Sequence, residues 1–276
     1  TAREGYALAD LADRVDRKVQ VGFQYRYSPG FQEARRILSA GWIGPLHRAN
    51  LHASAWFRTQ RYFDDAAWRG TWAVAGGGVL MNQAVHDVDA FVWFAGMPSR
   101  VTAVARRLLH RIEVEDDCLA LLEFPDGAQG ILHASTSEVA GASRIELFGD
   151  RGTMGVTQQE VALARTDGSI RAYSDTCPQT MTVPPLAREA RKGPESPSFQ
   201  AMVVACHENL IAAIREGSPL MNPPRDATRP VELVNAVYLS ASTGRPVPLP
   251  LDTDAYEDLL WRLRSGKASI GPACGA

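Results

Sequence analysis

The chain has 276 residues, of which 45% are hydrophobic and 22% charged, proportions typical of a globular protein that buries a core of its own. Its formal net charge of −2 leaves no basic surplus to neutralise phosphates, so no nucleic-acid partner is expected. Its apolar runs are far shorter than the ~20 residues that cross a membrane as a helix, so no membrane partner is expected either.

The first 44 residues predict the end of an α/β domain. Apolar residues recur at helical spacing over 4–16, and the run 19–23 is typical of a buried strand. A loop follows, and Pro29 predicts the start of a second helix over about 30–40. This is too little to form a parallel sheet, which needs several such units.

From Pro45 onward the pattern becomes that of a mostly antiparallel sheet. Strand-like runs follow one another closely, with turn sequences at 125–127 and 150–152 between some of them. The predicted strands are 47–57, 100–109, 117–124, 128–136 and 143–149, and a helix is predicted over 82–95. The fold class expected is therefore α+β, with an open sheet that packs one face against helices.

The last third of the chain is expected to supply two of those helices. Amphipathic segments at about 198–216 and 225–241 end before Gly217 and Gly244, which are typical helix stops. An edge strand and a short last helix follow. The segment 157–197 is weakly patterned and is predicted as loop.

The strongest functional signal is the stretch GGGVLMNQAVHDVD, residues 76–89. Three glycines before a helix suggest a phosphate-binding loop. A dinucleotide fingerprint needs a glycine at the sixth position, however, where this chain has Met81, and no Walker lysine is present. We therefore interpret the glycines as a turn that lets a ligand approach the backbone, followed by a helix with Asn82 as its N-cap.

His86 is the candidate catalytic residue of this helix. It falls on one helical stripe with Asn82 and Asp89, near the helix start. A histidine pKa of ~6.5 suits proton transfer at neutral pH, so His86 is a candidate general base. A single histidine on a helix is more often structural than catalytic, and the residues alone leave that alternative open.

The pattern of cysteines and histidines indicates neither a metal site nor a disulfide scaffold. The four cysteines stand far apart without a C-x-x-C pair, and the six histidines do not cluster at metal-ligand spacing. No metal cofactor is expected, and a metal-dependent hydrolase is disfavoured. The cysteine pattern is typical of a reducing cytoplasm, which is the predicted location.

The longer stretch WRGTWAVAGGGVLMNQAVHDVDAFVWFAG resembles the hallmark of the Gfo/Idh/MocA family, the glucose–fructose oxidoreductase and inositol dehydrogenase group. Residues 1–31 resemble the part of that family that follows its Glu-Lys-Pro motif. Residues 229–251 are similar to the family's C-terminal helix and strand. The resemblance is weakest over 157–197.

The resemblance implies an NAD- or NADP-dependent oxidoreductase that acts on a hydroxyl of a sugar, sugar acid, polyol or nucleotide sugar. It gives His86 the role of the acid/base. It puts Asn82, which cannot take a proton, in the role of orienting the hydroxyl. Asp89 either contacts the substrate or orients the histidine.

The resemblance also implies the residues that surround this pair. Gln24 would border the cofactor, with Tyr25 and Arg26 beside the substrate. Trp68 and Arg69 are candidates for the sugar pocket, since an indole stacks on sugar faces and a guanidinium binds acidic groups. For Trp68, a place in the core is the alternative.

Two parts of the family pattern are missing from this sequence, namely G-x-G-x-x-G and Glu-Lys-Pro. We therefore expect residues 1–28 to be the remnant of a dinucleotide-binding Rossmann domain whose first ~100–120 residues lie outside this chain. Residues 29–276 would form the α/β substrate-binding and oligomerisation domain, inactive alone. The alternative function is a non-catalytic sugar-binding or assembly module. The resemblance further implies a homodimer or homotetramer formed through the open face of the sheet.

Overall fold

A computed structural model describes residues 1–192 and 198–271 of the chain, and its centre is one sheet. The strands are β1 (Leu46–Ala53), β2 (Arg100–Arg106), β3 (Asp117–Glu123), β4 (Gln129–Ser135), β5 (Ser143–Gly149), β6 (Gly152–Val156), β7 (Glu160–Arg165), β8 (Ala187–Lys192) and β9 (Val247–Pro248). Their order across the nine-stranded sheet is β8-β7-β6-β5-β1-β4-β3-β2-β9. Neighbours are antiparallel except β1 and β4, which run parallel.

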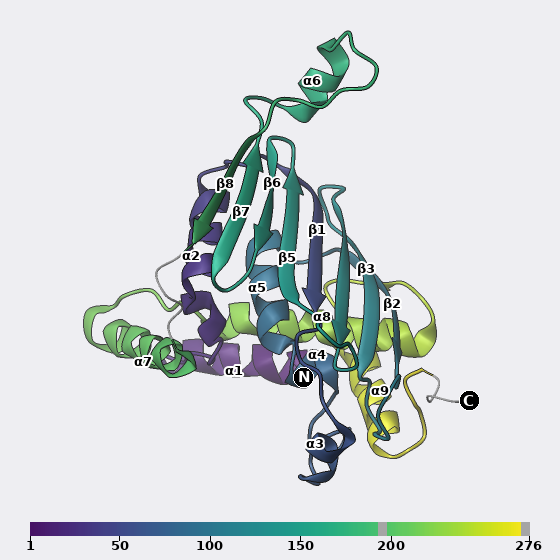
Figure 1. Ribbon diagram of the computed structural model, residues 1–276. Helices are drawn as coiled ribbons and strands as arrows, with labels where there is room; N and C mark the ends of the chain where they lie inside the picture. The colour runs from purple at the N-terminus through teal and green to yellow at the C-terminus, as the bar shows by residue number, and fades with distance from the viewer. Residues whose placement is uncertain (193–197, 272–276) are drawn as a thin grey trace.

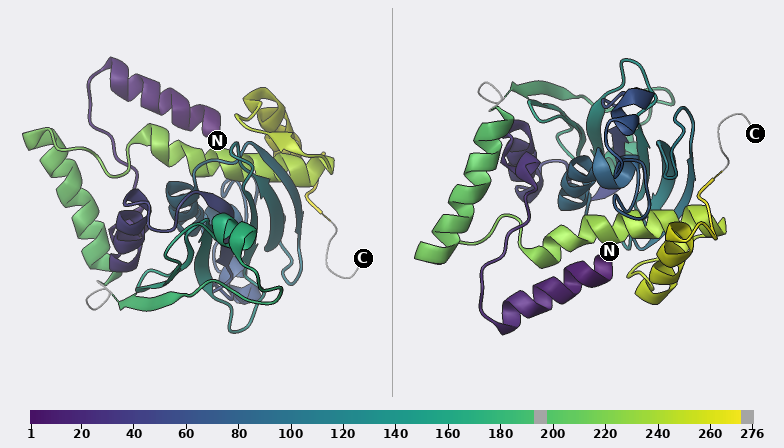
Figure 2. Two further views of the ribbon diagram at one scale, coloured as in Figure 1. Left: turned by 90° about the horizontal axis from the view of Figure 1, so that it is seen from above. Right: turned by 90° about the horizontal axis from the view of Figure 1, so that it is seen from below.

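Most of the helices gather on one face of this sheet. The helices of the described residues are α1 (Ala2–Arg14), the 3₁₀ turn η1 (Gln24–Tyr27), α2 (Pro29–Ser39), α3 (Gln60–Asp64), α4 (Val79–Asn82), α5 (Val85–Ala95), α6 (Ile170–Thr176), α7 (Phe199–Glu216), α8 (Pro224–Thr243) and α9 (Thr253–Arg264). Figure 1 shows α2, α5 and α8 behind the sheet, with α6 beyond one end of it and α3 beyond the other. The two views of Figure 2 show α1 lying alongside α8.

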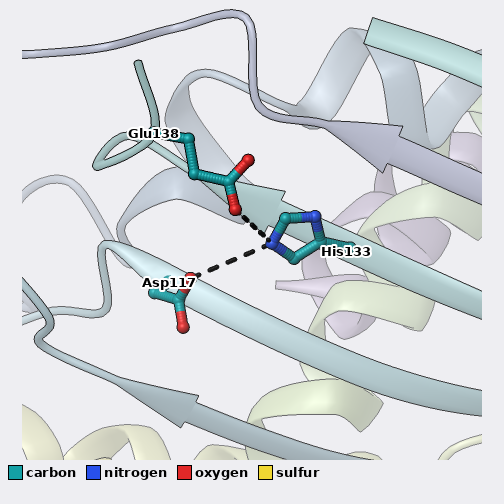
Figure 3. Close-up of side chains that lie close together, drawn as sticks. All are labelled: Asp117, His133 and Glu138. Atoms are coloured by element: carbon teal, nitrogen blue, oxygen red, sulfur yellow. Dashed lines mark ion pairs between the residues drawn. The ribbon is translucent and has the colours of Figure 1, made fainter. Parts of the chain in front are cut away.

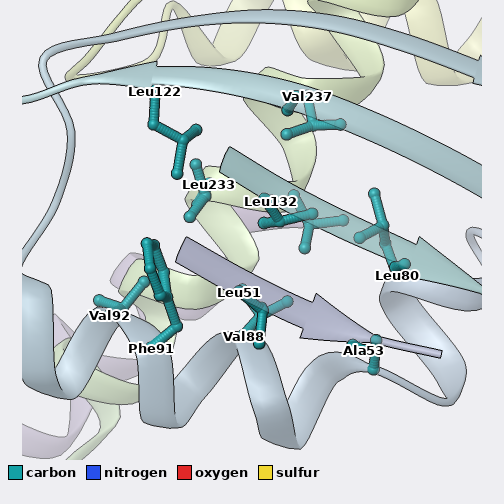
Figure 4. Packing of buried hydrophobic residues seen from close by; sticks show 14 of the residues in the cluster. Leu51, Ala53, Leu80, Val88, Phe91, Val92, Leu122, Leu132, Leu233 and Val237 are labelled. Carbon is teal, nitrogen blue, oxygen red and sulfur yellow. The ribbon is translucent and has the colours of Figure 1, made fainter. Parts of the chain in front are cut away.

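The core lies between the sheet and helices α5 and α8. Because side chains alternate between the two faces of a strand, Leu51 of β1 and Leu132 of β4 point the same way, toward the helices. There they meet Val88 of α5 and Leu233 of α8, all fully buried (Figure 4). Burial of such side chains contributes about 1.5–3 kcal/mol each and fixes α5 against the sheet.

The opposite face of the sheet carries no helix among the described residues. Its side chains belong to the alternate set, so Val104, Leu119 and Leu121 are exposed there. His52 and His133, which are partners across β1 and β4, lie on this same face. The face therefore combines apolar side chains with polar ones, and we call it the open face.

The structure confirms the predicted fold class and most of the predicted elements. The helices expected near 4–16, 30–40, 198–216 and 225–241 correspond to α1, α2, α7 and α8. The residues expected to stop the last two, Gly217 and Gly244, have left-handed φ angles of 72° and 64°. No helix in 1–192 or 198–271 is both long and apolar enough to cross a membrane.

The strand predicted at 19–23 is wrong, because this segment is extended but joins no sheet among the described residues. The Val21 N–H donates instead to the carbonyl oxygen of Asn222, and the Gln20 side chain donates to that of Cys206. A strand needs a neighbouring strand to satisfy its backbone, and this segment has loops and helix α7 beside it. The loop predicted over 157–197 is also partly wrong, since it contains β7, α6 and β8; residues 193–197 lie outside the described part.

The prediction of Asn82 as an N-cap is wrong as well, and Glu115 is the reason. The buried Glu115 carboxylate accepts hydrogen bonds from the backbone N–H of Gly78 at 2.9 Å and of Leu80 at 3.0 Å. These contacts cap a helical turn that begins before Asn82, so α4 ends at Asn82 and α5 starts separately at Val85.

Glu115 also changes the interpretation of the glycines. A Cβ atom at Gly78 would lie 1.7 Å from the carbonyl oxygen of Glu115, and one at Gly77 would lie 2.3 Å from the Tyr238 hydroxyl. Gly77 and Gly78 are therefore required for close packing inside the protein. Only Gly76, with a φ of 71° and no neighbour within 4 Å, keeps an open side.

We expect Gly78→Ala to lower the free energy of unfolding by about 2 kcal/mol or more, because the added methyl group collides with backbone that cannot move freely. Chemical denaturation measures the change. Gly22→Ala is the matched control, since a Cβ at Gly22 meets nothing within 4 Å. Equal stability of the two variants would contradict the packing role.

Candidate active site

His86 is the second residue of α5, and its ring sits against two aromatic side chains. The ring centroid lies 5.7 Å from that of Phe23, edge to face, and 4.9 Å from that of Tyr25. Nδ1 is buried without a hydrogen-bond partner, whereas Nε2 is not enclosed in this way. Burial lowers the pKa of His86, so the imidazole is neutral at pH 7 and able to accept a proton.

An ion pair fixes the loop that carries Tyr25 to the helix that carries His86. Arg26 Nε donates to Asp89 Oδ2 at 2.8 Å and Arg26 Nη2 to Asp89 Oδ1 at 2.6 Å, which is a bidentate geometry. The side chains are 3% and 0% exposed. Burial raises the pKa of Asp89 to about 6 against the opposing effect of Arg26, so the carboxylate is charged at neutral pH.

This pair alters the expectation for both residues. Arg26 and Asp89 face each other, and Arg26 Nη1 donates to the carbonyl oxygen of Met221 at 2.9 Å. Neither side chain presents an open surface to a substrate. Their geometry suits the alternative considered for Asp89, that of positioning the helix and the ring of His86.

Gln24 precedes Tyr25 on η1, and Asn82 is the last residue of α4. Gln24, on η1, is 4% exposed and so offers little surface to a cofactor. Asn82 is partly exposed at the end of α4, four residues before His86, which is on the next helix. Asn82 is thus the more accessible of the two.

Trp68 and Arg69 lie in the segment between α3 and α4. The Arg69 guanidinium stacks 4.2 Å from the ring centroid of Tyr62 and 5.5 Å from that of Trp68. The Tyr62 hydroxyl accepts a hydrogen bond from Gln83, which directly follows Asn82. Trp68 is 43% exposed, so it is not a core residue. Arg69 lines a cleft of about 750 Å³ together with His110.

Asp87, next to His86, is a site residue that the sequence analysis missed. Its carboxyl group is buried, and Trp56 Nε1 lies 3.4 Å from Oδ2. Burial raises the pKa of Asp87 to about 7, and Asp87 in turn raises the pKa of Tyr25, adding to the effect of burial there. Asp87 lines a second cleft, of about 290 Å³, with Trp56 and Gln158. The sequence signal for Asp87 is its spacing of four residues from Phe91. Residues at that spacing lie on the same side of a helix, and Phe91 is buried.

We expect Arg26→Met to lower the free energy of unfolding by about 3–5 kcal/mol, because it leaves the Asp89 carboxylate buried without a partner. The double variant Arg26→Met/Asp89→Leu should recover most of this loss. Arg100→Met, which breaks the exposed pair with Glu123, is the control and should cost about 1 kcal/mol or less. If denaturant titration gave the same cost for both single variants, the pair would have no structural role.

The raised pKa of Asp87 predicts a pH-dependent stability. The folded chain holds this proton up to about pH 7, whereas the unfolded chain releases it near pH 4, so stability falls as pH rises between those values. Asp87→Asn removes this effect and should gain about 2–4 kcal/mol relative to the native chain between pH 4 and pH 8. The exposed Asp167→Asn serves as control; a pH-independent difference for Asp87→Asn would disprove the shift.

The sequence of the chain is similar to a known protein family and to several dehydrogenases. Residues 31–155 match the GFO/IDH/MocA C-terminal domain. The chain is 25% identical over 255 residues to a D-apiose dehydrogenase of Paraburkholderia graminis, covering 90% of this chain and 64% of that protein. It is 24% identical over 241 residues to an inositol 2-dehydrogenase of Rhizobium meliloti, covering 84% and 65%.

Among solved structures, the WlbA dehydrogenase from Bordetella pertussis, in complex with NADH and UDP-GlcNAcA, is similar with a TM-score of 0.71 and 26% identity. The match covers 91% of this chain and 69% of that one. The chain thus spans slightly less than two thirds of the length of these two curated relatives.

Proposed function

From the match of residues 31–155 to the GFO/IDH/MocA C-terminal domain, we propose that the chain is the substrate-binding part of an NAD- or NADP-dependent dehydrogenase. The substrate class is a sugar, sugar acid, polyol or nucleotide sugar that is oxidised at a hydroxyl group. The observation that carries the proposal is His86, a neutral histidine with one enclosed and one accessible ring nitrogen at the start of a buried helix. Two similar proteins named as dehydrogenases of D-apiose and inositol support the substrate class.

His86 acts as the acid/base in this proposal. Its Nε2 accepts the hydroxyl proton as the carbon–oxygen bond becomes a carbonyl, and returns it in the reverse reaction. The lowered pKa keeps the ring neutral and ready to accept a proton at pH 7. Asn82, partly exposed at the end of α4, orients the same hydroxyl by hydrogen bonding and exchanges no proton.

The buried neighbours of His86 hold it in place. Tyr25 and Phe23 limit rotation of the imidazole, and the Arg26–Asp89 pair locks η1 onto α5. We therefore assign Arg26, Asp89 and Tyr25 to positioning the ring. A general base gains rate only when it is held in the reactive geometry, so this rigidity serves the chemistry.

The cleft at Arg69 is the proposed place for the distal part of the substrate. Trp68 offers an exposed indole face and Arg69 a guanidinium that is already stacked on Tyr62. An indole face suits a sugar ring, and a stacked guanidinium suits a carboxylate or phosphate. Arg69 stacks on Tyr62, whose hydroxyl accepts a hydrogen bond from Gln83, two residues before α5.

A nicotinamide cofactor supplies the hydride acceptor when bound. The accessible Nε2 of His86, walled by two aromatic rings, fits the reacting end of such a site. The glycine turn does not fit the phosphates, because the N–H groups of Gly78 and Leu80 already bind the Glu115 carboxylate. We therefore propose that residues 29–276 bind the substrate and that 1–28 belong to a separate dinucleotide-binding domain, with Gln24 at its border.

For assembly, we propose a homodimer or homotetramer formed through the open face. The exposed Val104, Leu119 and Leu121 support this, since water-exposed apolar side chains gathered on one face favour a protein contact. A cytoplasmic location is proposed from the cysteines, because Cys118, Cys177 and Cys206 are all free thiols.

The test is nicotinamide reduction by the full-length gene product, assayed with polyols, hexoses, sugar acids and nucleotide sugars. We expect NADH or NADPH formation with at least one class. Saturable binding of a sugar without reduction of either cofactor would instead favour a non-catalytic module.

With a substrate in hand, His86→Ala should lower kcat by about 10²–10⁴-fold, since the proton acceptor is lost. His207→Ala is the matched control, because His207 is an exposed histidine on α7 whose Nδ1 lies 2.8 Å from the carbonyl oxygen of Val203. Steady-state kinetics should show the control unchanged. A rate for His86→Ala within about threefold of the native rate would remove His86 from the mechanism.

A further inference from the structure

Three side chains of types that bind metal ions meet on the open face, from β3, from β4 and from the loop after β4. Asp117 begins β3, His133 lies in β4, and Glu138 belongs to the loop after β4. Figure 3 shows the carboxylates of Asp117 and Glu138 both directed at the His133 ring. One potential ligand atom from each lies within 4.8 Å of the other two.

The register of the strands explains this meeting. Asp117 is paired with Ser135, and Leu119 is paired with His133, so Asp117 and His133 are diagonal neighbours on one face of the sheet. His133 Nε2 lies 3.2 Å from Glu138 Oε1 and 3.9 Å from Asp117 Oδ1. Ligand atoms that bind one small ion at about 2.0–2.2 Å stand at similar separations.

We propose that Asp117, His133 and Glu138 form a binding site for a divalent transition-metal ion, with Zn²⁺ as its probe. One imidazole and two carboxylates are a ligand set that such ions accept, and a protein zinc site needs three or four ligands. His52 stands beside His133 across the strand pair, with ring centroids 6.1 Å apart, and lies outside the group of ligand atoms that are within 4.8 Å of one another.

The charges around the three residues favour a cation. Arg106 binds Asp117 through Oδ2 at 2.7 Å, which leaves Oδ1 directed at His133. A divalent ion at this point would add positive charge between the two carboxylates, with the Arg106 contact orienting the Asp117 ligand.

The site is separate from the proposed active site. His133 is on the open face, whereas His86 is on α5, which packs against the other face of the sheet. In the single chain, Asp117, His133 and Glu138 are 13%, 21% and 43% exposed, so an ion can reach them from solvent. The ion would tie the loop that carries Glu138 to the sheet, a structural role that adds stability and leaves the dehydrogenase chemistry to His86.

The test is Zn²⁺ binding to tag-free protein that has been stripped with a chelator, measured by calorimetry or by competition with a chromophoric chelator. One equivalent of Zn²⁺ should bind per chain. His133→Ala should weaken binding by at least about tenfold, and so should Glu138→Gln, whose exposed loop position leaves folding intact. His47→Ala, an exposed histidine in β1, should bind as the native chain does.

Added Zn²⁺ should also raise the Tm of the native chain and of His47→Ala, and leave the Tm of His133→Ala unchanged. Absence of saturable Zn²⁺ binding would overturn the proposal. So would native affinity in both His133→Ala and Glu138→Gln, because the ion would then be held elsewhere.

Discussion

The buried ion pair between Arg26 and Asp89 is the contact on which the candidate site depends. It joins η1, near the start of the chain, to α5 through two residues that are 63 positions apart, and both side chains are buried. Such a pair contributes little net stability but is costly to break, so it specifies one arrangement of the two segments. That arrangement places Tyr25 against the His86 ring and fixes the direction of its accessible nitrogen.

A second buried carboxylate, that of Glu115, organises the glycine turn and α4, which precede α5 in the chain. Glu115 binds the backbone of Gly78 and Leu80 and the hydroxyl of Tyr238, so it links β3, the glycine turn and α8. The pKa of Glu115 is raised to about 7 by burial, which the three hydrogen bonds oppose. The glycine motif is therefore explained by packing as much as by access for a ligand. Gly76 alone keeps the open side that the sequence suggested for the whole turn.

Strands and helix ends that depend on local periodicity and turn residues can be predicted from the sequence. Features that depend on contacts between distant residues cannot. Alternation around Leu51 and Leu132 predicts the sheet, and Gly217 and Gly244 predict the helix ends. The confirmed family resemblance follows from the motif at 76–89. The early cap of α4 depends on Glu115, more than 30 residues away, and the Asp117–His133–Glu138 cluster depends on strand register. Neither is visible as a local pattern. The roles of His86, Asn82, Trp68 and Arg69 remain proposals.

The central claim is that His86 exchanges a proton with the substrate hydroxyl. The most direct measurement is a crystal structure of the full-length gene product with its oxidised nicotinamide cofactor and a substrate or unreactive analogue. We expect the His86 Nε2 to lie within about 2.6–3.2 Å of the hydroxyl on the carbon that faces the nicotinamide. A substrate bound with that hydroxyl against another side chain, and with His86 outside hydrogen-bond reach even through one water, would contradict it.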